Sequence, residues 1–265
     1  MLEQITPIIL TYNESPNIGR LLDKLSWAAR VFVIDSFSTD DTVSVISRFP
    51  NVHLFQRAFD RHADQWNFAL KETGVRTEWV LALDADYLVT RELVEELKEL
   101  CPPDSVAGYT VRFRYCMMGR PLRHCLYPPT VVLYRKNRAH YVQDGHTQRL
   151  VVEGAVASLT SFMDHDDRKP FSRWLASQDC YARLEAQKLI SSRFSELDWP
   201  DRIRKLRIVF PWLIFLHCLF GKGLVLDGLA GIYYAAQRML AECFLSLRLL
   251  QYDFARIKGK TPRTV

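Results

Sequence analysis

Apolar and polar residues follow two different periods along the first hundred positions of the chain. Short runs rich in branched and aromatic residues, typical of buried strands, occupy residues 5–12, 31–34, 52–55 and 79–83. Apolar residues recur every three or four positions, as on one face of a helix, at 18–25, 42–49, 63–73 and 91–100. This alternation of strands and helices predicts an α/β fold, Rossmann-like, with a mostly parallel central sheet flanked by helices.

The pattern becomes less regular after Pro102 and Pro103. Alternating apolar and polar positions predict strands at 107–116, 130–135 and 148–153, and helical spacing returns at 172–190. We interpret these strands as the second half of the same sheet. Residues 201–207 then hold four basic side chains, and 208–220 are almost entirely apolar. A run of 13 residues is too short to span a bilayer as a helix, which needs about 20 residues.

Composition narrows the class of protein. A chain of 265 residues can form one large domain or a domain with an appendage. The net charge of +5 is too small to indicate a nucleic-acid partner. Six scattered cysteines without a CxxC pair argue against a zinc ribbon and favour a reducing compartment. No signal-peptide pattern precedes the first strand, so we expect a cytoplasmic protein.

Candidate chemistry lies where three predicted strands end: at Thr11–Glu14, at Asp35, and at Asp84 with Asp86. The carboxyl ends of parallel strands share one edge of a sheet, where α/β proteins bind ligands. Asp84 and Asp86 lie on the same face of an extended chain and repel each other unless a cation lies between them. Carboxylates of this kind suit Mg²⁺ or Mn²⁺ shared with phosphates. The alternative is a solvated acidic turn. Neither a GxGxxG motif nor a P-loop is present.

Four motifs in order carry a family resemblance: TYNE, VIDSFSTDDT, RAFDRHADQWNFAL and WVLALDADY. The chain resembles the inverting family 2 glycosyltransferases of GT-A fold over about residues 5–190. Three later segments, YPPTVVLYRK, HYVQDGHTQR and HDDRKPFSRWLASQDCYARLEA, resemble the bacterial branch that adds glucose to the lipopolysaccharide inner core. Phe37 replaces the small residue that is usual in the second motif.

The resemblance implies a domain plan and a set of roles. A GT-A catalytic domain would cover 1–195, with nucleotide-sugar binding in 1–103 and the acceptor half in 104–195, and 196–265 would be a helical appendage. Asp35 would contact the uracil of a UDP-sugar, while Asp84 and Asp86 would hold the ribose and the metal. Other residues expected at the nucleotide, sugar or phosphates are Thr11, Asn13, Glu14, Arg57, His62 and Asn67.

An inverting transfer needs a general base that removes the proton of the acceptor hydroxyl. Asp144 is our first choice because it precedes Gly145 and lies in the acceptor half. The alternative is a simple turn, since Asp-Gly is a common turn pair. Glu153 and Asp166 are rival bases.

The segment His165–Lys169 is a second dense cluster of charge. His165 would be a third metal ligand, as a later histidine is in some GT-A enzymes, and Arg168 and Lys169 would neutralise a diphosphate. The alternative is a solvated loop before a helix that begins near Pro170. Weaker candidates are His146 and Arg149, and three tryptophans are expected in the core or as sugar-stacking walls, namely Trp66, Trp79 and Trp174.

The tail admits two interpretations. A basic run followed by an apolar, aromatic stretch suits a helix in the interface of an anionic membrane. The alternative is a set of helices that packs on the domain or forms a homo-oligomer. We therefore expect a metal-dependent glycosyltransferase, peripheral on the inner face of the cytoplasmic membrane, that moves a hexose from a UDP-sugar to a lipid-linked glycan. The rival functions are transfer to polyprenyl phosphate, sugar nucleotidyl transfer, and a non-catalytic membrane-bound scaffold.

Overall fold

The computed structural model describes residues 1–144 and 147–258, and contacts within it divide the chain into two units. The first unit holds Met1–Pro121 and Leu126–Lys169, and the second holds Leu122–Cys125 and the chain from Pro170 onward. The domain boundary predicted at residue 195 stays a prediction. Within the second unit, helix α5 (Phe171–Ser191) packs against the C-terminal helix α8 (Gly228–Ile257) through Ala182, Ala186, Leu189, Leu245 and Leu249.

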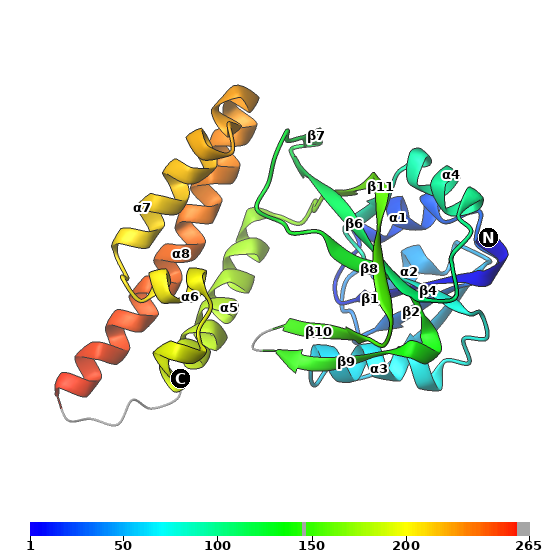
Figure 1. The fold of residues 1–265 in the computed structure, drawn as a ribbon, viewed down its shortest axis with the longest axis horizontal. Helices are drawn as coiled ribbons and strands as arrows, with labels where there is room; N and C mark the ends of the chain where they lie inside the picture. The colour runs from blue at the N-terminus through cyan, green and yellow to red at the C-terminus, as the bar shows by residue number, and fades with distance from the viewer. Residues whose placement is uncertain (145–146, 259–265) are drawn as a thin grey trace. The chain divides into compact units, whose positions relative to one another are not determined.

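A nine-stranded sheet forms the centre of the first unit, in the order β3-β2-β1-β4-β8-β6-β11-β5, with β7 paired to β6 (Figure 1). The neighbours from β3 to β4 are all parallel. β8 is antiparallel to both β4 and β6, whereas β11 is parallel to β6 and antiparallel to β5. The strands are β1 (Ile5–Thr11), β2 (Val31–Asp35), β3 (Val52–Gln56), β4 (Trp79–Asp84), β5 (Tyr87–Val89), β6 (Val106–Met117), β7 (Arg120–Pro121), β8 (Thr130–Arg135) and β11 (Ala155–His165).

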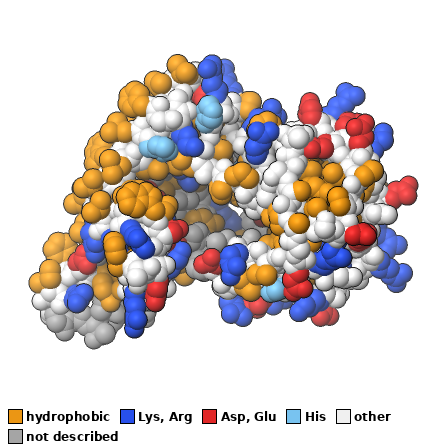
Figure 2. All heavy atoms as spheres, in the orientation of Figure 1, with side chains coloured by type: hydrophobic (Ala, Val, Ile, Leu, Met, Phe, Trp, Pro, Cys, Tyr) orange, Lys and Arg blue, Asp and Glu red, His pale blue; other side chains and the backbone are white. Residues whose placement is uncertain are grey.

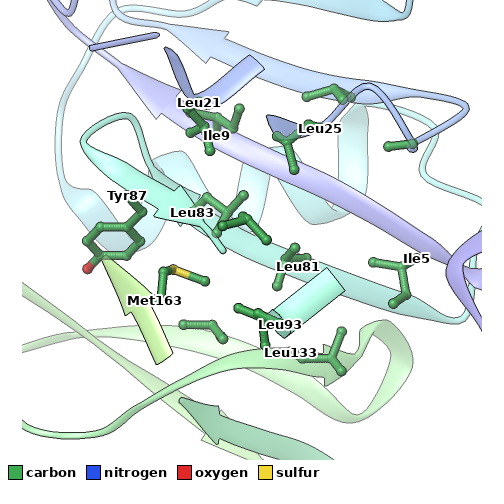
Figure 3. Packing of buried hydrophobic residues seen from close by; sticks show 14 of the residues in the cluster. Ile5, Ile9, Leu21, Leu25, Leu81, Leu83, Tyr87, Leu93, Leu133 and Met163 are labelled. Carbon is green, nitrogen blue, oxygen red and sulfur yellow. The ribbon is translucent and has the colours of Figure 1, made fainter. Parts of the chain in front are cut away.

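Alternation along the parallel strands divides the core into two layers. Ile9, Val33 and Leu81 point to one face, where they pack against α1 (Ile18–Lys24), α2 (Thr42–Ile46) and α4 (Arg91–Glu99) (Figure 3). Ile8, Ile34 and Val80 point to the other face, against α3 (His62–Glu72). Both faces of these strands are therefore buried, which explains their nearly continuous apolar sequence.

A two-stranded ribbon, β9 (Ala139–Asp144) paired with β10 (Thr147–Val152), packs beside α3. Trp66 of α3 stacks on Tyr141 of β9 with 5.2 Å between ring centroids. Trp79 is buried beneath the Arg135 guanidinium, whose carbon lies 4.6 Å from the ring centroid. Trp66 and Trp79 are thus core residues, and Trp174 in the second unit stacks on Phe171.

The second unit is helical. After α5 come α6 (Trp199–Arg204), α7 (Val209–Leu216), a π turn (His217–Gly221), a 3-10 turn (Leu224–Asp227) and α8. Short 3-10 turns also occur at Leu2–Gln4, Lys136–Arg138 and Phe194–Glu196. Arg204 of α6 donates to Glu242 of α8 at 2.9 Å and so joins the two helices. It also donates to Asp201 of its own helix at 2.8 Å.

Within the described residues, no single helix has both the length and the apolarity for a membrane span. The segments Val209–Gly221 and Leu224–Ile257 meet the criterion only as a pair, and that pair is bent by 72°.

The elements predicted before residue 100 are all present, with ends shifted by a few residues. Four strands were not predicted from the sequence: β5, β7, β9 and β11. β11 is long, but only Leu159 and Met163 are buried along it and its other side chains are largely polar or small. It therefore lacks the alternation that marks a strand in sequence.

Candidate functional site

Parallel pairing brings the three predicted strand ends together. Thr11 of β1 lies opposite Asp35 of β2, and Leu10 lies opposite Asp84 of β4. The carboxyl ends of β2, β1 and β4 therefore form one edge, as the sequence predicted.

The loops that follow β1 and β2 are tied to each other. The Asn13 amide donates to Ser38 Oγ at 2.8 Å, and the Thr39 amide donates to Asn13 Oδ1 at 2.7 Å. Glu14 is anchored in the same way, through its amide to Thr42 Oγ1 at 2.7 Å. Asn13 and Phe37 both have left-handed backbones, with φ of 55° and 57°. Asparagine tolerates this conformation, but phenylalanine is strained in it.

Asp35 organises this pair of loops. Its carboxylate is fully buried and accepts from the Thr11 hydroxyl at 3.1 Å. It also accepts from the Ser38 amide at 2.9 Å and the Ser38 hydroxyl at 2.5 Å, and Gln56 Nε2 adds a contact at 3.3 Å. Both oxygens are thus occupied by protein donors, and the expected contact of Asp35 with uracil stays a prediction.

Asp86 lies beside two cationic or potentially cationic side chains. His165 Nε2 is 3.2 Å from Asp86 Oδ2, and Lys169 Nζ is 3.9 Å from the same oxygen. Antiparallel pairing of β11 with β5 places His165 opposite Tyr87, and the Asp166 amide donates to the Asp86 carbonyl at 2.9 Å. The predicted grouping of Asp86 with His165 is therefore present, although these residues are far apart in sequence.

Lys169 also reaches the first strand's loop. Its ammonium donates to Glu14 Oε1 at 2.6 Å and lies 3.5 Å from Asp167 Oδ1. Burial disfavours the ammonium, but Asp86, Glu14 and Asp167 outweigh that effect and raise the pKa of Lys169. Burial also raises the pKa of Glu14, against the opposing effect of Lys169. Lys169 is therefore a buried cation shared among three carboxylates.

The two carboxyl groups of the Asp-x-Asp motif have opposite pKa shifts. Burial and the neighbouring Asp86 raise the pKa of Asp84 to about 6. Burial acts in the same direction on Asp86, but His165 and Lys169 outweigh it and lower the pKa of Asp86 to about 2. Asp86 is therefore ionised at neutral pH, and Asp84 carries the cost of two like charges close together.

An aromatic wall surrounds the imidazole of His165. Tyr87, Tyr115 and Tyr127 lie with ring centroids 5.4, 4.5 and 5.2 Å from that of His165. The Tyr87 and Tyr127 hydroxyls are 2.5 Å apart, and Tyr87 also donates to the Asp84 carboxyl. Tyr127 was missed as a site residue. It opens the YPPT segment, but nothing in that segment's local pattern indicates proximity to His165.

Asp166, one of the rival bases, is instead bound by two guanidinium groups. Asp166 Oδ2 accepts from Arg20 and Arg168 Nη2 at 2.7 Å each. Although burial raises the pKa of Asp166, these hydrogen bonds outweigh it and keep the pKa below its usual range. The Arg168 amide donates to Asn17 Oδ1 at 2.9 Å. Arg20 and Asn17 therefore fasten helix α1 to the segment that carries His165 and Lys169, and sequence analysis missed both.

Three other predicted donor-binding residues have protein partners. Arg57 pairs with Asp60 at 2.8 Å and also donates to Gln65, and His62 packs on Phe59 with centroids 4.9 Å apart. Asn67 Nδ2 donates to the Tyr141 carbonyl at 2.8 Å, and Asn67 Oδ1 accepts from the Tyr141 amide at 3.0 Å. Asn67 therefore holds the β9 strand on α3, and contacts of these residues with sugar or phosphate stay predictions.

Asp144 is the last residue of β9 and is exposed, as are Glu153 and Arg149. His146 and Gly145 lie outside the described residues. The role of Asp144 as base therefore stays a prediction.

The expected metal can be tested against the unsatisfied atoms of the site. Asp86 Oδ1 and His165 Nδ1 are buried and have no hydrogen-bond partner among the described residues. A carboxylate oxygen and an imidazole nitrogen are suitable ligands for Mn²⁺ or Mg²⁺. The described residues contain no group of three His, Cys, Asp or Glu side chains that could hold a metal ion. Asp86 Oδ1 is thus open to a metal, whereas His165 faces Asp86 Oδ2 through its Nε2, and the role of His165 as a metal ligand stays a prediction.

The sequence was compared with models of known protein families. The model of glycosyl transferase family 2 matches residues 6–150. The chain belongs to glycosyl transferase family 2. As a family 2 glycosyltransferase, it moves a sugar from a nucleotide-sugar with inversion at the anomeric carbon.

Relatives of this family 2 glycosyltransferase cover most of its length. It is 25% identical over 247 residues to the lipopolysaccharide core biosynthesis glycosyltransferase LpsC of Rhizobium meliloti (strain 1021), covering 87% of this chain and 86% of that protein. Its fold is similar to S. aureus TarS in complex with UDP-GlcNAc, with 14% identity, a TM-score of 0.49, and 98% and 93% of the two chains covered.

A second solved structure is similar over a smaller part of the chain. It is glucosyl-3-phosphoglycerate synthase of Mycobacterium tuberculosis with Mn²⁺, UDP and phosphoglyceric acid, at 14% identity and a TM-score of 0.45. The match covers 70% of this chain and 77% of that protein. Both TM-scores are low, so nothing about the ligands of this chain follows from them.

Proposed function

We propose that this family 2 enzyme transfers a hexose, with glucose as the favoured sugar, from a UDP-sugar to a lipid-anchored saccharide such as the lipopolysaccharide inner core. The observation that carries the proposal is the acidic and basic cluster of Glu14, Asp84, Asp86, His165 and Lys169 at the carboxyl edge of the sheet. Similarity to a lipopolysaccharide core glycosyltransferase over 87% of the chain supports the choice of acceptor. The reaction would take place at the inner face of the cytoplasmic membrane.

In the proposed site, carboxylates and cations have different roles. Asp86 and His165 would hold Mg²⁺ or Mn²⁺, which offsets the charge that develops on the leaving diphosphate. Lys169 is already a buried cation beside Asp86, so it can also approach diphosphate oxygens once the donor is bound. The base is proposed to be Asp144, which would take the proton of the acceptor hydroxyl.

A screen of UDP-sugars for metal-dependent hydrolysis and transfer tests the donor, with and without a lipid-linked acceptor. Asp86→Ala is expected to abolish transfer and to weaken UDP binding in Mn²⁺, because the variant loses a carboxylate at the diphosphate. Unchanged calorimetric binding of UDP would remove the metal role of Asp86.

Asp144→Asn tests the base, with Glu153→Gln as the matched control. Asp144→Asn is expected to leave UDP-sugar binding intact and to lower turnover by ~10²-fold or more, while Glu153→Gln retains turnover. Loss of turnover in Glu153→Gln alone would identify Glu153, and not Asp144, as the general base. Normal turnover in both variants would favour an acceptor that is already ionised, such as polyprenyl phosphate.

A further inference from the structure

Helix α7 and the π turn that follows it carry a stripe of exposed apolar side chains, which we call the α7 stripe: Val209, Trp212, Leu213, Leu216 and Phe220. Their spacing of three and four residues places them on one face of a helix. Trp212 is 59% exposed and Phe220 is 68% exposed. Surface helices of soluble proteins normally turn such a face toward the core, so this face lacks a partner within the described residues.

The connection from α7 to α8 continues the apolar surface. Val225, Leu226 and Leu229 are exposed, and Leu229 is 85% exposed. Figure 2 shows hydrophobic side chains gathered along the margin of the α7–α8 pair. Connections between helices are usually polar, because their backbone and side chains face water. An apolar connection next to an apolar stripe indicates a single extended contact surface.

The charge around this surface is largely positive, because Asp227, which lies between Leu226 and Leu229, pairs with Arg123. Residues 202–226 contain no Asp or Glu, and their five basic residues are Arg202, Arg204, Lys205, Arg207 and Lys222. Arg204 and Arg207 pair with Glu242 and Asp253 of α8. Within the part of the chain that the structure describes, Arg202, Lys205 and Lys222 form no ion pair. The Arg202 guanidinium already donates to the Leu197 carbonyl at 2.8 Å and to the Ser195 carbonyl at 3.3 Å. Lys205 and Lys222 are therefore the basic side chains that remain available to anions beside the apolar surface.

This combination favours a lipid surface over a second copy of the chain. A symmetric dimer through the α7 stripe would bring the same basic flank of each copy toward the other. Anionic headgroups with acyl chains beneath them match both the charge and the apolar face. Trp212 and the 73% exposed Trp199 are also suited to the boundary between headgroups and acyl chains.

We propose that the α7 stripe and the connection up to Leu229 lie in the interface of an anionic bilayer, with Lys205 and Lys222 at the lipid phosphates. The exposed basic side chains beside the stripe and the bend of 72° between Val209–Gly221 and Leu224–Ile257 favour a position in the plane of one leaflet. The proposal stands independently of the sugar and acceptor proposed above.

Flotation of the full chain with vesicles tests the proposal, with phosphatidylcholine alone compared with a mixture containing phosphatidylglycerol. The wild type is expected to float with the anionic vesicles and to be released by high salt. Trp212→Glu combined with Leu216→Glu is expected to lower the partition coefficient at least tenfold. Leu247→Glu is the matched control, because Leu247 is 60% exposed on α8 but lies outside the α7 stripe. It should bind like the wild type.

A second variant separates the charge from the apolar contact. Lys205→Gln with Lys222→Gln is expected to weaken binding to anionic vesicles several-fold and to reduce its salt dependence. Equal binding of the wild type and the Trp212/Leu216 variant would overturn the proposal. So would a wild-type dimer that this variant converts to a monomer, because a second copy would then cover the stripe. Calorimetry of UDP binding to each variant tests the donor site separately. Loss of UDP binding would count against the proposed donor site, whereas loss of vesicle binding concerns the membrane proposal alone.

Discussion

The two carboxylates of the Asp-x-Asp motif should have opposite effects on stability when each is neutralised. In the folded chain, the pKa of Asp84 is about 6 against an ordinary 3.8, mainly because the group is buried beside Asp86. One pKa unit corresponds to about 1.4 kcal/mol, so ionised Asp84 costs the folded state about 3 kcal/mol at pH 7. Asp84→Asn removes that cost and still offers an oxygen to the Tyr87 hydroxyl. It should therefore raise the free energy of unfolding by up to about 3 kcal/mol.

Asp86→Asn is the matched control. The pKa of Asp86 falls from 3.8 to about 2 because His165 and Lys169 outweigh its burial. That difference corresponds to about 2 kcal/mol of stabilisation at pH 7, which the amide loses. Asp86→Asn should therefore lower the free energy of unfolding, and both variants should lose transfer activity.

The effect of pH distinguishes the two carboxyls further. Asp84 has a raised folded pKa, so its cost is absent below pH 3.8 and grows as pH rises through 6. Asp86 has a depressed folded pKa, so its stabilisation is present above pH 3.8 and is lost as pH falls through 2. At pH 4 the gain from Asp84→Asn should shrink to under about 1 kcal/mol, while the loss from Asp86→Asn largely remains.

Urea unfolding of metal-free protein in chelator, followed by circular dichroism at pH 4 and pH 7, measures both effects. Chelator is needed because a bound cation would neutralise the repulsion and hide the difference. A decrease in stability for Asp84→Asn at pH 7 would refute the reasoning, as would shifts of the same sign for both variants.

Three further predictions concern the same unit. Binding of UDP with Mn²⁺, measured by calorimetry, should strengthen as pH rises to about 6 and level off above it, because protonated Asp84 is the poorer ligand; affinity independent of pH from 5 to 7 would contradict this. Phe37→Gly should raise the free energy of unfolding by about 1 kcal/mol, since glycine adopts the left-handed backbone without the penalty of a side chain; destabilisation in urea would contradict it. Asn67→Ala should lower the free energy of unfolding by about 1–3 kcal/mol, because the Tyr141 amide and carbonyl lose their partners; unchanged stability would show that water replaces them.

Predictions from sequence succeeded where local periodicity carries the information. The apolar strands before residue 84 predicted parallel neighbours, and the structure pairs Thr11 with Asp35 and Leu10 with Asp84. The apolar run at 208–220 left two interpretations open, membrane contact and packing against protein, and in the structure the α7 stripe is exposed.

Only tertiary structure decided which distant side chains join that edge. His165 reaches Asp86 because β11 pairs with β5 in one particular register, and β11 has too few buried apolar residues to be predicted as a strand. Tyr127 and Arg20 could not be predicted as site residues for the same reason, because their contacts with His165 and Asp166 join elements far apart in sequence. The sequence by itself determined the acidic strand ends, because an apolar run and the acidic residues that follow it are local features of the chain. Register, burial and the sharing of Lys169 among three carboxylates depend on long-range packing, and only the folded chain decided them.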